Sequence, residues 1–358
     1  FKKKKAGRGE AQKAWERQRE LQKALLTCTG ADDILRLAPE LDERITISTA
    51  LHRLGRCAGL GAAAAVLDDP RLQDLLAKFR VALPLFGSRQ IANALHGLGS
   101  LRYCACDSAL VAGVALQAQR RAHEFEPQHV SNTLWACARM RLKDSAMLHA
   151  LLAQGIKIIQ EYRPLDYSLT TWALATLAHR DIAWLRALVG VRPAFADFSP
   201  QQLANFAWGL ASLSLRNCNL MFALGRSVVV KLDEFKPQEL SNYLWALATF
   251  DLVDNLALHS IRQEIIMQGP DKLSAWDPQS VANAMWAYAT LAVKDDVLFG
   301  FFVRAAIAHV DRFSSQELAN SIWATAMVLF RCSEFLAAAA AKVARDVRHM
   351  EPLHLAQV

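Results

Sequence analysis

Apolar and polar residues alternate along this chain with the period of an amphipathic helix. In the stretch 198–213, Leu203, Ala207 and Leu210 fall near one angle of a helical wheel and form an apolar stripe. Ser199 stands at the N-cap position, and Pro200 follows at the first helical position, where a missing N–H costs nothing. This stretch therefore predicts a short helix with a defined start.

The same stretch recurs along the chain. Each copy carries an aromatic ring near the middle of the expected helix, and the rings are 36 to 44 residues apart. A second amphipathic segment, such as 219–231, lies between successive copies. The pattern predicts an all-α fold, an α-solenoid of stacked helical hairpins with about eight repeats of roughly 37 residues. The aligned ring positions are His52, His96, Trp135, Trp172, Trp208, Trp245, Trp286 and Trp323.

The repeat also divides the chain. We expect a basic N-terminal tail and helix over 1–30, with the helix itself at 11–26, and the solenoid over 31–349. Residues 350–358 read as the opening of a further repeat. The longer interval before Trp286 holds Gly269-Pro270-Asp271, which predicts a turn in a surface insertion.

The composition indicates a hydrophobic core and a modest positive charge. The 358 residues are 53% hydrophobic and carry a formal net charge of +7, which is compatible with a polyanionic partner. The densest basic run, Lys2, Lys3, Lys4 and Lys5, is either a solvated tail or an arm on a nucleic-acid backbone.

Several function classes find no support. No apolar run approaches the 18 residues of a membrane span, so we expect no membrane partner. The seven cysteines are scattered, and the one close pair, Cys104 and Cys106, lacks a second pair at zinc-site spacing. Phosphate-binding, metalloprotease and nucleophile motifs are absent. We expect neither an enzyme nor a catalytic or metal site, and no cofactor or small-molecule substrate.

One polar face recurs beside the apolar stripe. In the copy at 198–213 it consists of Gln201, Asn205, Trp208 and Ser212. The asparagines could form a ladder that satisfies backbone groups between hairpins, or a row that touches a sugar–phosphate backbone together with nearby basic residues. The candidate RNA-binding residues of the second reading, besides the lysine run, are Arg89, Asn93, Asn132, Arg139, Arg141, Lys143, Asn205, Asn242, Asn283 and Asn320.

A base-by-base code would need polar residues that vary from repeat to repeat. The residue after the repeat glutamine and the residue after the asparagine are the candidate positions. The first series mixes acids with amides, and its glutamates would repel phosphate. The second includes Phe206 and Tyr243, which could stack on bases or pack in the core. No clean code is visible in either series.

The Pro-Gln-x-Leu-Ala/Ser-Asn-x-x-Trp-Ala-x-Ala pattern at 127–138, 237–248 and 278–289 resembles the octotricopeptide-repeat proteins. It is similar, more loosely, to the repeats of FAST-kinase-like RNA-binding proteins. The resemblance implies an RNA-binding solenoid in mitochondria or chloroplasts, and it assigns RNA contact to the repeat asparagine. Leu169 and Thr49 break that asparagine column. The RAP domain that ends some relatives is not seen.

On this basis we expect an RNA-stabilising component of a ribonucleoprotein in the mitochondrial matrix, or alternatively the chloroplast stroma. The mitochondrial ribosome, with its rRNA and neighbouring subunits, is the leading expectation. A free factor for one organellar transcript and a protein–protein scaffold are the alternatives. Loss of Arg139, Arg141 and Lys143 should weaken RNA binding while the helical content holds.

Overall fold

The computed structural model describes residues 2–58, 61–104 and 107–350, and of residues 2–14, 255 and 349 it describes the backbone only. Within these ranges the regular structure is entirely helical. The chain folds as two compact units, unit 1 over Phe1–Val191 and unit 2 over Arg192–Val358. The predicted all-α solenoid of helical hairpins is confirmed.

The predicted helix around the asparagine and the ring is the first helix of each hairpin, here called the A helix. In most copies proline occupies its first turn, and the preceding aromatic residue is buried, as Phe198 is before α12. The A helices are α3 (Arg44–Cys57), α6 (Ser88–Ser100), α8 (Pro127–Arg139), α10 (Pro164–Thr176), α12 (Pro200–Ser212), α14 (Pro237–Thr249), α16 (Pro278–Thr290) and α18 (Ser315–Val328).

The second helix of each hairpin, the B helix, often begins at an aspartate or asparagine cap. Asp107, Asp144 and Asn217 each accept a backbone N–H of the first turn. The B helices are α5 (Pro70–Ala82), α7 (Ser108–Arg120), α9 (Ser145–Lys157), α11 (Ile182–Val191), α13 (Cys218–Val230), α15 (Asn255–Leu273), α17 (Asp296–His309) and α19 (Ser333–Asp346).

Short 3-10 helices follow α2 and most of the B helices. They are η1 (Ala38–Glu40), η2 (Leu83–Leu85), η3 (Ala122–Glu124), η4 (Ile159–Glu161), η5 (Phe195–Asp197), η6 (Leu232–Glu234), η7 (Val310–Arg312) and η8 (Val347–His349).

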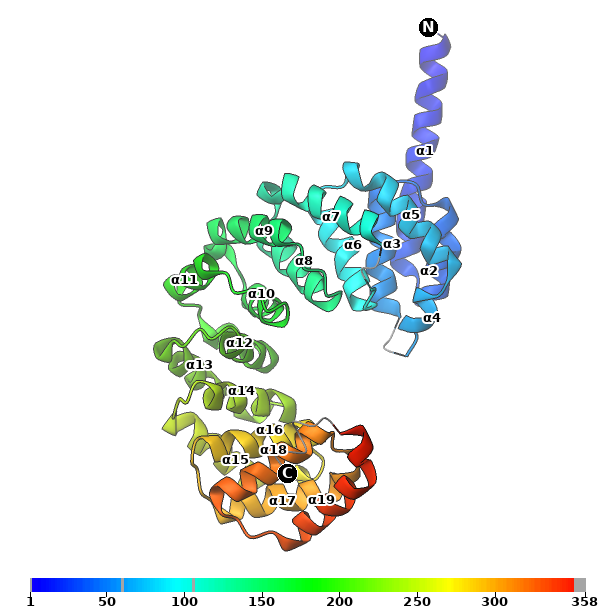
Figure 1. Ribbon diagram of the computed structural model, residues 1–358. Helices are drawn as coiled ribbons and strands as arrows, with labels where there is room; N and C mark the ends of the chain where they lie inside the picture. The colour runs from blue at the N-terminus through cyan, green and yellow to red at the C-terminus, as the bar shows by residue number, and fades with distance from the viewer. Residues whose placement is uncertain (1, 59–60, 105–106, 351–358) are drawn as a thin grey trace. The chain divides into compact units, whose positions relative to one another are not determined.

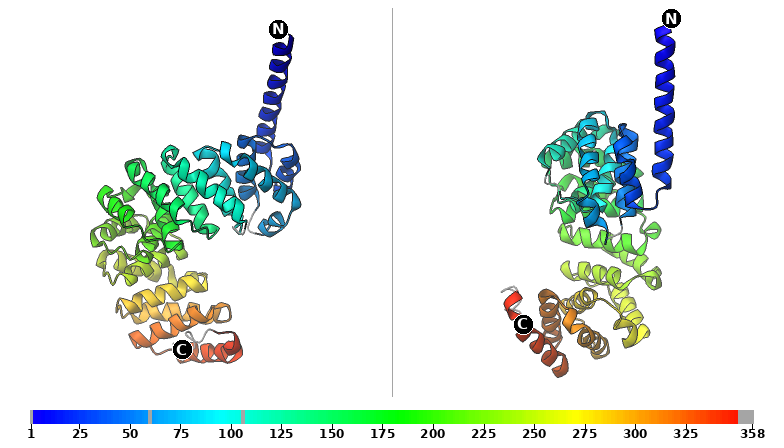
Figure 2. Two further views of the ribbon diagram at one scale, coloured as in Figure 1. Left: turned by 45° about the horizontal axis from the view of Figure 1, so that its top comes forward. Right: turned by 90° about the vertical axis from the view of Figure 1, so that its right-hand side faces the viewer.

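The hairpins stack in two layers inside each unit. Successive A helices pack on each other, α6 on α8 and α14 on α16, and B helices pack on B helices (Figures 1 and 2). The backbones of α3 and α6 approach closely, since a Cβ added to Gly97 would lie 2.0 Å from the carbonyl oxygen of Leu51. Gly55 faces the same contact, so both glycines serve close helix packing.

Each A helix from α6 onward ends with a residue in the left-handed region, although none of these residues is glycine. At the end of α8, Arg141 has a φ of 55°, and the N–H of Leu142 bonds back to the carbonyl of Cys137. This is the Schellman arrangement, which satisfies the last carbonyls of the helix. The equivalent residues are Arg102, Arg141, Ala178, Ser214, Asp251, Ala292 and Leu329.

The ends of the chain differ in part from expectation. The first helix, α1 (Lys2–Thr27), begins nine residues before the predicted start, because the Lys-rich run consists mainly of good helix formers. It is followed by α2 (Ala31–Leu37), and α4 (Ala63–Leu67) precedes α5. The insertion before Trp286 lengthens α15, which kinks at Gly269 (φ 77°). The expected further repeat at 350–358 lies almost wholly outside the described residues.

Candidate nucleic-acid interface

One face of each A helix carries the recurring polar residues and the ring. We call it the A-helix face, and in α12 it consists of Gln201, Asn205, Trp208 and Ser212. The spacing of four, three and four residues keeps these side chains in one sector of the helix. Gln201 is exposed, whereas Asn205 and Trp208 are half-buried, and the same holds for their equivalents in α8, α14, α16 and α18.

The repeat asparagines do not form the ladder considered above. Through the described part of the chain, none of the six side-chain amides has a hydrogen bond to another group of the protein. Each amide is half-buried, so it remains within reach of a partner at the surface. The six are Asn93, Asn132, Asn205, Asn242, Asn283 and Asn320.

Beside the asparagines the rings form a row in each unit. In unit 1, His96 stacks on Trp135 with ring centroids 4.8 Å apart, and His52 lies 5.3 Å from His96. In unit 2, Trp208, Trp245 and Trp286 follow at 6.4 Å intervals. Both histidines therefore act as ring members of the packed row.

The side chains of the two series considered for base reading have structural roles in the fold. In the first, Gln202 and Glu239 each accept a backbone N–H at the start of their own helix, and Asp166, fully buried, also accepts a hydrogen bond from Ser131. In the second, Phe206 and Tyr243 are fully buried. Stacking of these two rings on bases is therefore excluded in this structure.

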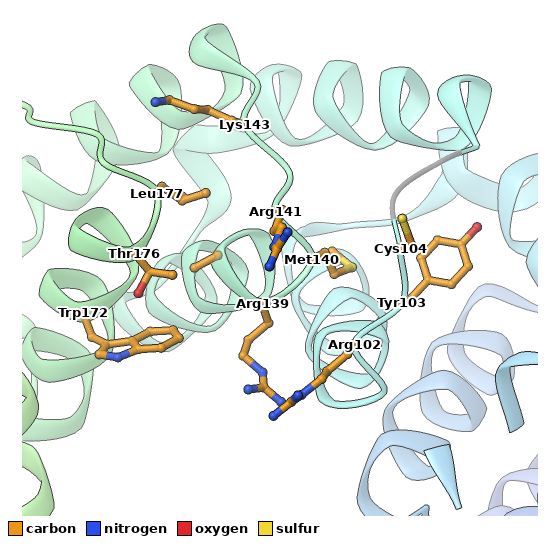
Figure 3. Close-up of a pocket in the computed structure, with 11 residues that line it drawn as sticks. Arg102, Tyr103, Cys104, Arg139, Met140, Arg141, Lys143, Trp172, Thr176 and Leu177 are labelled. Atoms are coloured by element: carbon orange, nitrogen blue, oxygen red, sulfur yellow. The ribbon is translucent and has the colours of Figure 1, made fainter. Parts of the chain in front are cut away.

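Three arginine side chains converge where α6 and α8 end. Arg102, Arg139 and Arg141 line a cavity of about 820 Å³, with the indole of Trp172 on its far wall (Figure 3). We call this cavity the arginine pocket. The guanidinium groups of Arg102 and Arg139 lie next to each other, whereas Lys143 points away from them and reaches toward the carbonyl of Ala178 at 3.4 Å.

The charge of the arginine pocket is not balanced from within the protein. Of the described residues that line it, none is acidic. Arg139 lies over the ring of Trp135 at 5.6 Å and donates from Nε to the carbonyl of Gly99 at 3.4 Å. Burial, and then the neighbouring charge of Arg102, lower the pKa of Arg139. An anion placed between the two guanidinium groups would offset this lowering, because it stabilises the charged form of both side chains.

A second cavity, of about 600 Å³, opens at the other end of α6 and α8. It brings together Arg89, Asn93 and Asn132 with Arg53 and Arg56 of α3. Glu126 is the one acidic residue among the described residues of its wall. Asn132 and Arg139 are seven residues apart on the same face of α8, so about 10 Å of helix joins the two cavities.

The predicted residues thus fall into three groups. Those of unit 1 from Arg89 to Arg141 line the two cavities, with Lys143 at the rim of the first. Asn205, Asn242, Asn283 and Asn320 lie on the A-helix faces of unit 2. Lys2, Lys3, Lys4 and Lys5 form the first turns of α1, and their side chains lie outside what the structure describes.

Sequence reasoning missed Arg53, Arg56 and Arg102. The repeat alignment held a signal for two of them, because Arg56 takes the position of Arg139 and Arg102 takes that of Arg141. Counting basic residues by repeat position, rather than by runs along the chain, would have found both.

The described residues contain neither a metal-ligating cluster nor a membrane-spanning helix. Over the described ranges, His, Cys, Asp and Glu side chains nowhere gather in threes that could hold a metal ion. Of the helices described, none has the length and apolar character to cross a bilayer.

Residues 90–255 match the family model of the RNA-editing substrate-binding complex 6 protein. The matched segment runs from α6 to the start of α15 and contains the whole arginine pocket. No curated protein sequence shows a significant match to the chain. The chain is therefore similar, over the middle of its length, to a protein of an RNA-editing substrate-binding complex.

Proposed function

We propose that the chain is an RNA-binding subunit of an organellar ribonucleoprotein and that it holds its RNA through the sugar–phosphate backbone. The observation that carries the proposal is the arginine pocket, where Arg102, Arg139 and Arg141 meet and the described lining holds no acidic residue. A structural role would pair such a cluster with carboxylates, as Arg262 pairs with Asp295 in unit 2.

Arginine suits this task because its planar guanidinium donates two parallel hydrogen bonds to phosphate oxygens. Arg139 is held in place by Trp135 and the Gly99 carbonyl, so less side-chain freedom is lost on binding. Trp172 on the opposite wall offers an indole against which the attached nucleoside can stack. The pocket therefore fits one nucleotide unit of a single strand.

Two resemblances support an RNA ligand. The name of the matched family ties its member to an RNA-editing substrate-binding complex. The asparagine motif resembles the octotricopeptide repeats, which implies RNA binding in mitochondria or chloroplasts. We place the protein in the mitochondrial matrix, with the chloroplast stroma as the alternative, and we propose a binding role without catalysis.

The two resemblances favour different ribonucleoprotein particles. The repeat motif led to the mitochondrial ribosome, with rRNA and ribosomal subunits as partners. The family match favours a particle that binds RNA-editing substrates. In both cases the protein recognises the shape and the sugar–phosphate backbone of the bound strand. The two repeat positions considered for a base-by-base code cannot serve it, because their side chains are buried or used as helix caps.

Fractionation of the native protein, followed by sequencing of its crosslinked RNA, tests the proposal. Sedimentation with ribosomal subunits and crosslinks to rRNA would establish the ribosomal role. Crosslinks to other transcripts in a particle without ribosomal proteins would establish the role in substrate binding, and a free transcript would establish a separate factor. Absence of crosslinked RNA from the native protein would refute the proposal in favour of a protein scaffold.

A further inference from the structure

The two units differ in charge at equivalent positions of their A helices. Arginine occurs at four positions relative to the ring residue of an A helix. One position lies seven residues before the ring residue, and the others lie one, four and six residues after it. All six of these arginines lie on, or within two residues after, the first three A helices, α3, α6 and α8. They are Arg53, Arg56, Arg89, Arg102, Arg139 and Arg141.

Unit 2 carries neutral side chains at almost all of these positions. The residue seven before the ring is glutamine in each of these helices. The residue one after the ring is glycine or alanine, and the residue four after it is serine, threonine or methionine. The residue six after the ring is Ser214, Asp251, Ala292 or Leu329. The basic residues Arg216, Lys294 and Arg331 lie in the loops that follow α12, α16 and α18. Arg216 donates to the carbonyl of Asp251 at 3.4 Å. The A-helix faces of unit 2 are thus polar without positive charge.

These neutral faces nevertheless present unsatisfied groups. Asn205, Asn242 and Asn283 each expose part of an amide that has no hydrogen bond within the described structure. The half-buried indoles of Trp208, Trp245 and Trp286 run alongside at 6.4 Å intervals. An amide offers one acceptor and two donors, so it matches groups that combine both kinds.

We propose that the amide–indole row of unit 2 binds unpaired RNA bases, whereas the arginines of unit 1 bind phosphates. The inference rests on the RNA-binding function proposed above and divides it between the units. An amide cannot neutralise a phosphate, but it can pair with the donor and acceptor edge of a base. An indole edge at the surface adds contact with the base plane.

The row recognises bases as a class. Each of the three helices α12, α14 and α16 offers the same glutamine, asparagine and tryptophan, and a constant set cannot encode a sequence that varies from base to base along the strand. Unit 2 therefore favours strands with free bases over duplex or abasic strands, whatever their sequence.

The test uses the full chain with Asn205→Ala, Asn242→Ala and Asn283→Ala combined. None of the three amides makes a hydrogen bond within the described part of the chain, and alanine is the better helix former, so we expect the variant to fold. The ligands are a single-stranded RNA oligomer and an abasic strand of the same length and phosphate charge. Affinity is measured for both at several salt concentrations.

We expect the wild-type protein to prefer the strand with bases, and the triple variant to lose on the order of tenfold to a hundredfold of affinity for that strand alone. The salt dependence of RNA binding by the triple variant stays as in the wild type, because the substitutions remove no phosphate contact. A variant with Arg102→Ala and Arg139→Ala serves as the control, and it loses affinity for both strands.

The outcomes separate the two proposals. If the triple variant binds both strands as the wild type does, or if its salt dependence weakens, the assignment of bases to unit 2 is overturned while RNA binding stands. If it instead loses a protein partner of the native particle, the row is a protein contact and the assignment is equally overturned. If the wild-type protein binds neither strand, the proposed function itself fails.

Discussion

Loss of the two adjacent arginines, Arg102 and Arg139, should weaken RNA binding in a way that depends on salt. Each phosphate neutralised on a single strand contributes about 0.7 to the slope of log affinity against log salt. If the two side chains share the one phosphate that the pocket fits, the double alanine variant should have a slope shallower by about 0.7. Between 50 and 200 mM salt the difference in affinity from the wild type then shrinks by roughly 2.6-fold.

The assay is a titration of a fluorescent single-stranded RNA at four or more salt concentrations. Arg120→Ala combined with Arg186→Ala is the matched control, because it removes equal charge from exposed positions of the B helices α7 and α11. Arg139→Lys should keep most of the slope, since it keeps the charge. An unchanged slope in the Arg102 and Arg139 variant, or an equal change in the control, would refute the assignment of phosphate contact to the pocket.

Three further predictions concern single side chains. Lys143→Ala should weaken RNA binding less than Arg139→Ala in the same titration, because Lys143 points away from the arginine pocket; equal losses would contradict this geometry. Gly97→Ala should lower the free energy of unfolding by about 1–3 kcal/mol or more in denaturant titrations, since its Cβ would lie 2.0 Å from the Leu51 oxygen. Gly190→Ala, whose Cβ meets nothing within 4 Å, should not be destabilising. Burial lowers the pKa of His96 to about 4, so the unfolded chain binds an extra proton between that pH and about 6.5. The free energy of unfolding should therefore fall by up to about 3 kcal/mol more in the wild type than in His96→Phe as the pH drops through that window, and parallel pH profiles would contradict the buried neutral imidazole.

The repeat architecture could be predicted from the sequence because its signals are local and repeated. Ser199 and Pro200 mark a helix start, and the spacing of Trp208 and Trp245 gives the period. The left-handed helix ends were not predicted, because Arg102 and Arg141 stand where glycine is the usual signal. At these helix ends the backbone itself satisfies the final carbonyl groups, and no particular residue type marks that geometry in the sequence.

The candidate site was predicted in part. Asn93, Asn132 and Arg139 share one repeat pattern, and the structure places them along one surface of α6 and α8. The convergence of Arg102 with Arg139 could not be derived from helical periodicity, because the two residues lie on different repeats and meet only when α6 packs on α8. The sequence also left open whether Phe206 was buried, and in the structure its ring packs against Phe195 and Phe198, which precede α12.

The central claim is that RNA lies along the A-helix faces. It is tested most directly by crosslinking a photoactivatable single-stranded RNA to the full chain and mapping the modified residues by mass spectrometry. We predict crosslinks at the ring positions and their neighbours on α6, α8, α10, α12 and α14, with Trp135, Trp172 and Trp208 among them. Crosslinks confined to the B helices α7, α9 and α13, or absent from the chain, would contradict the account.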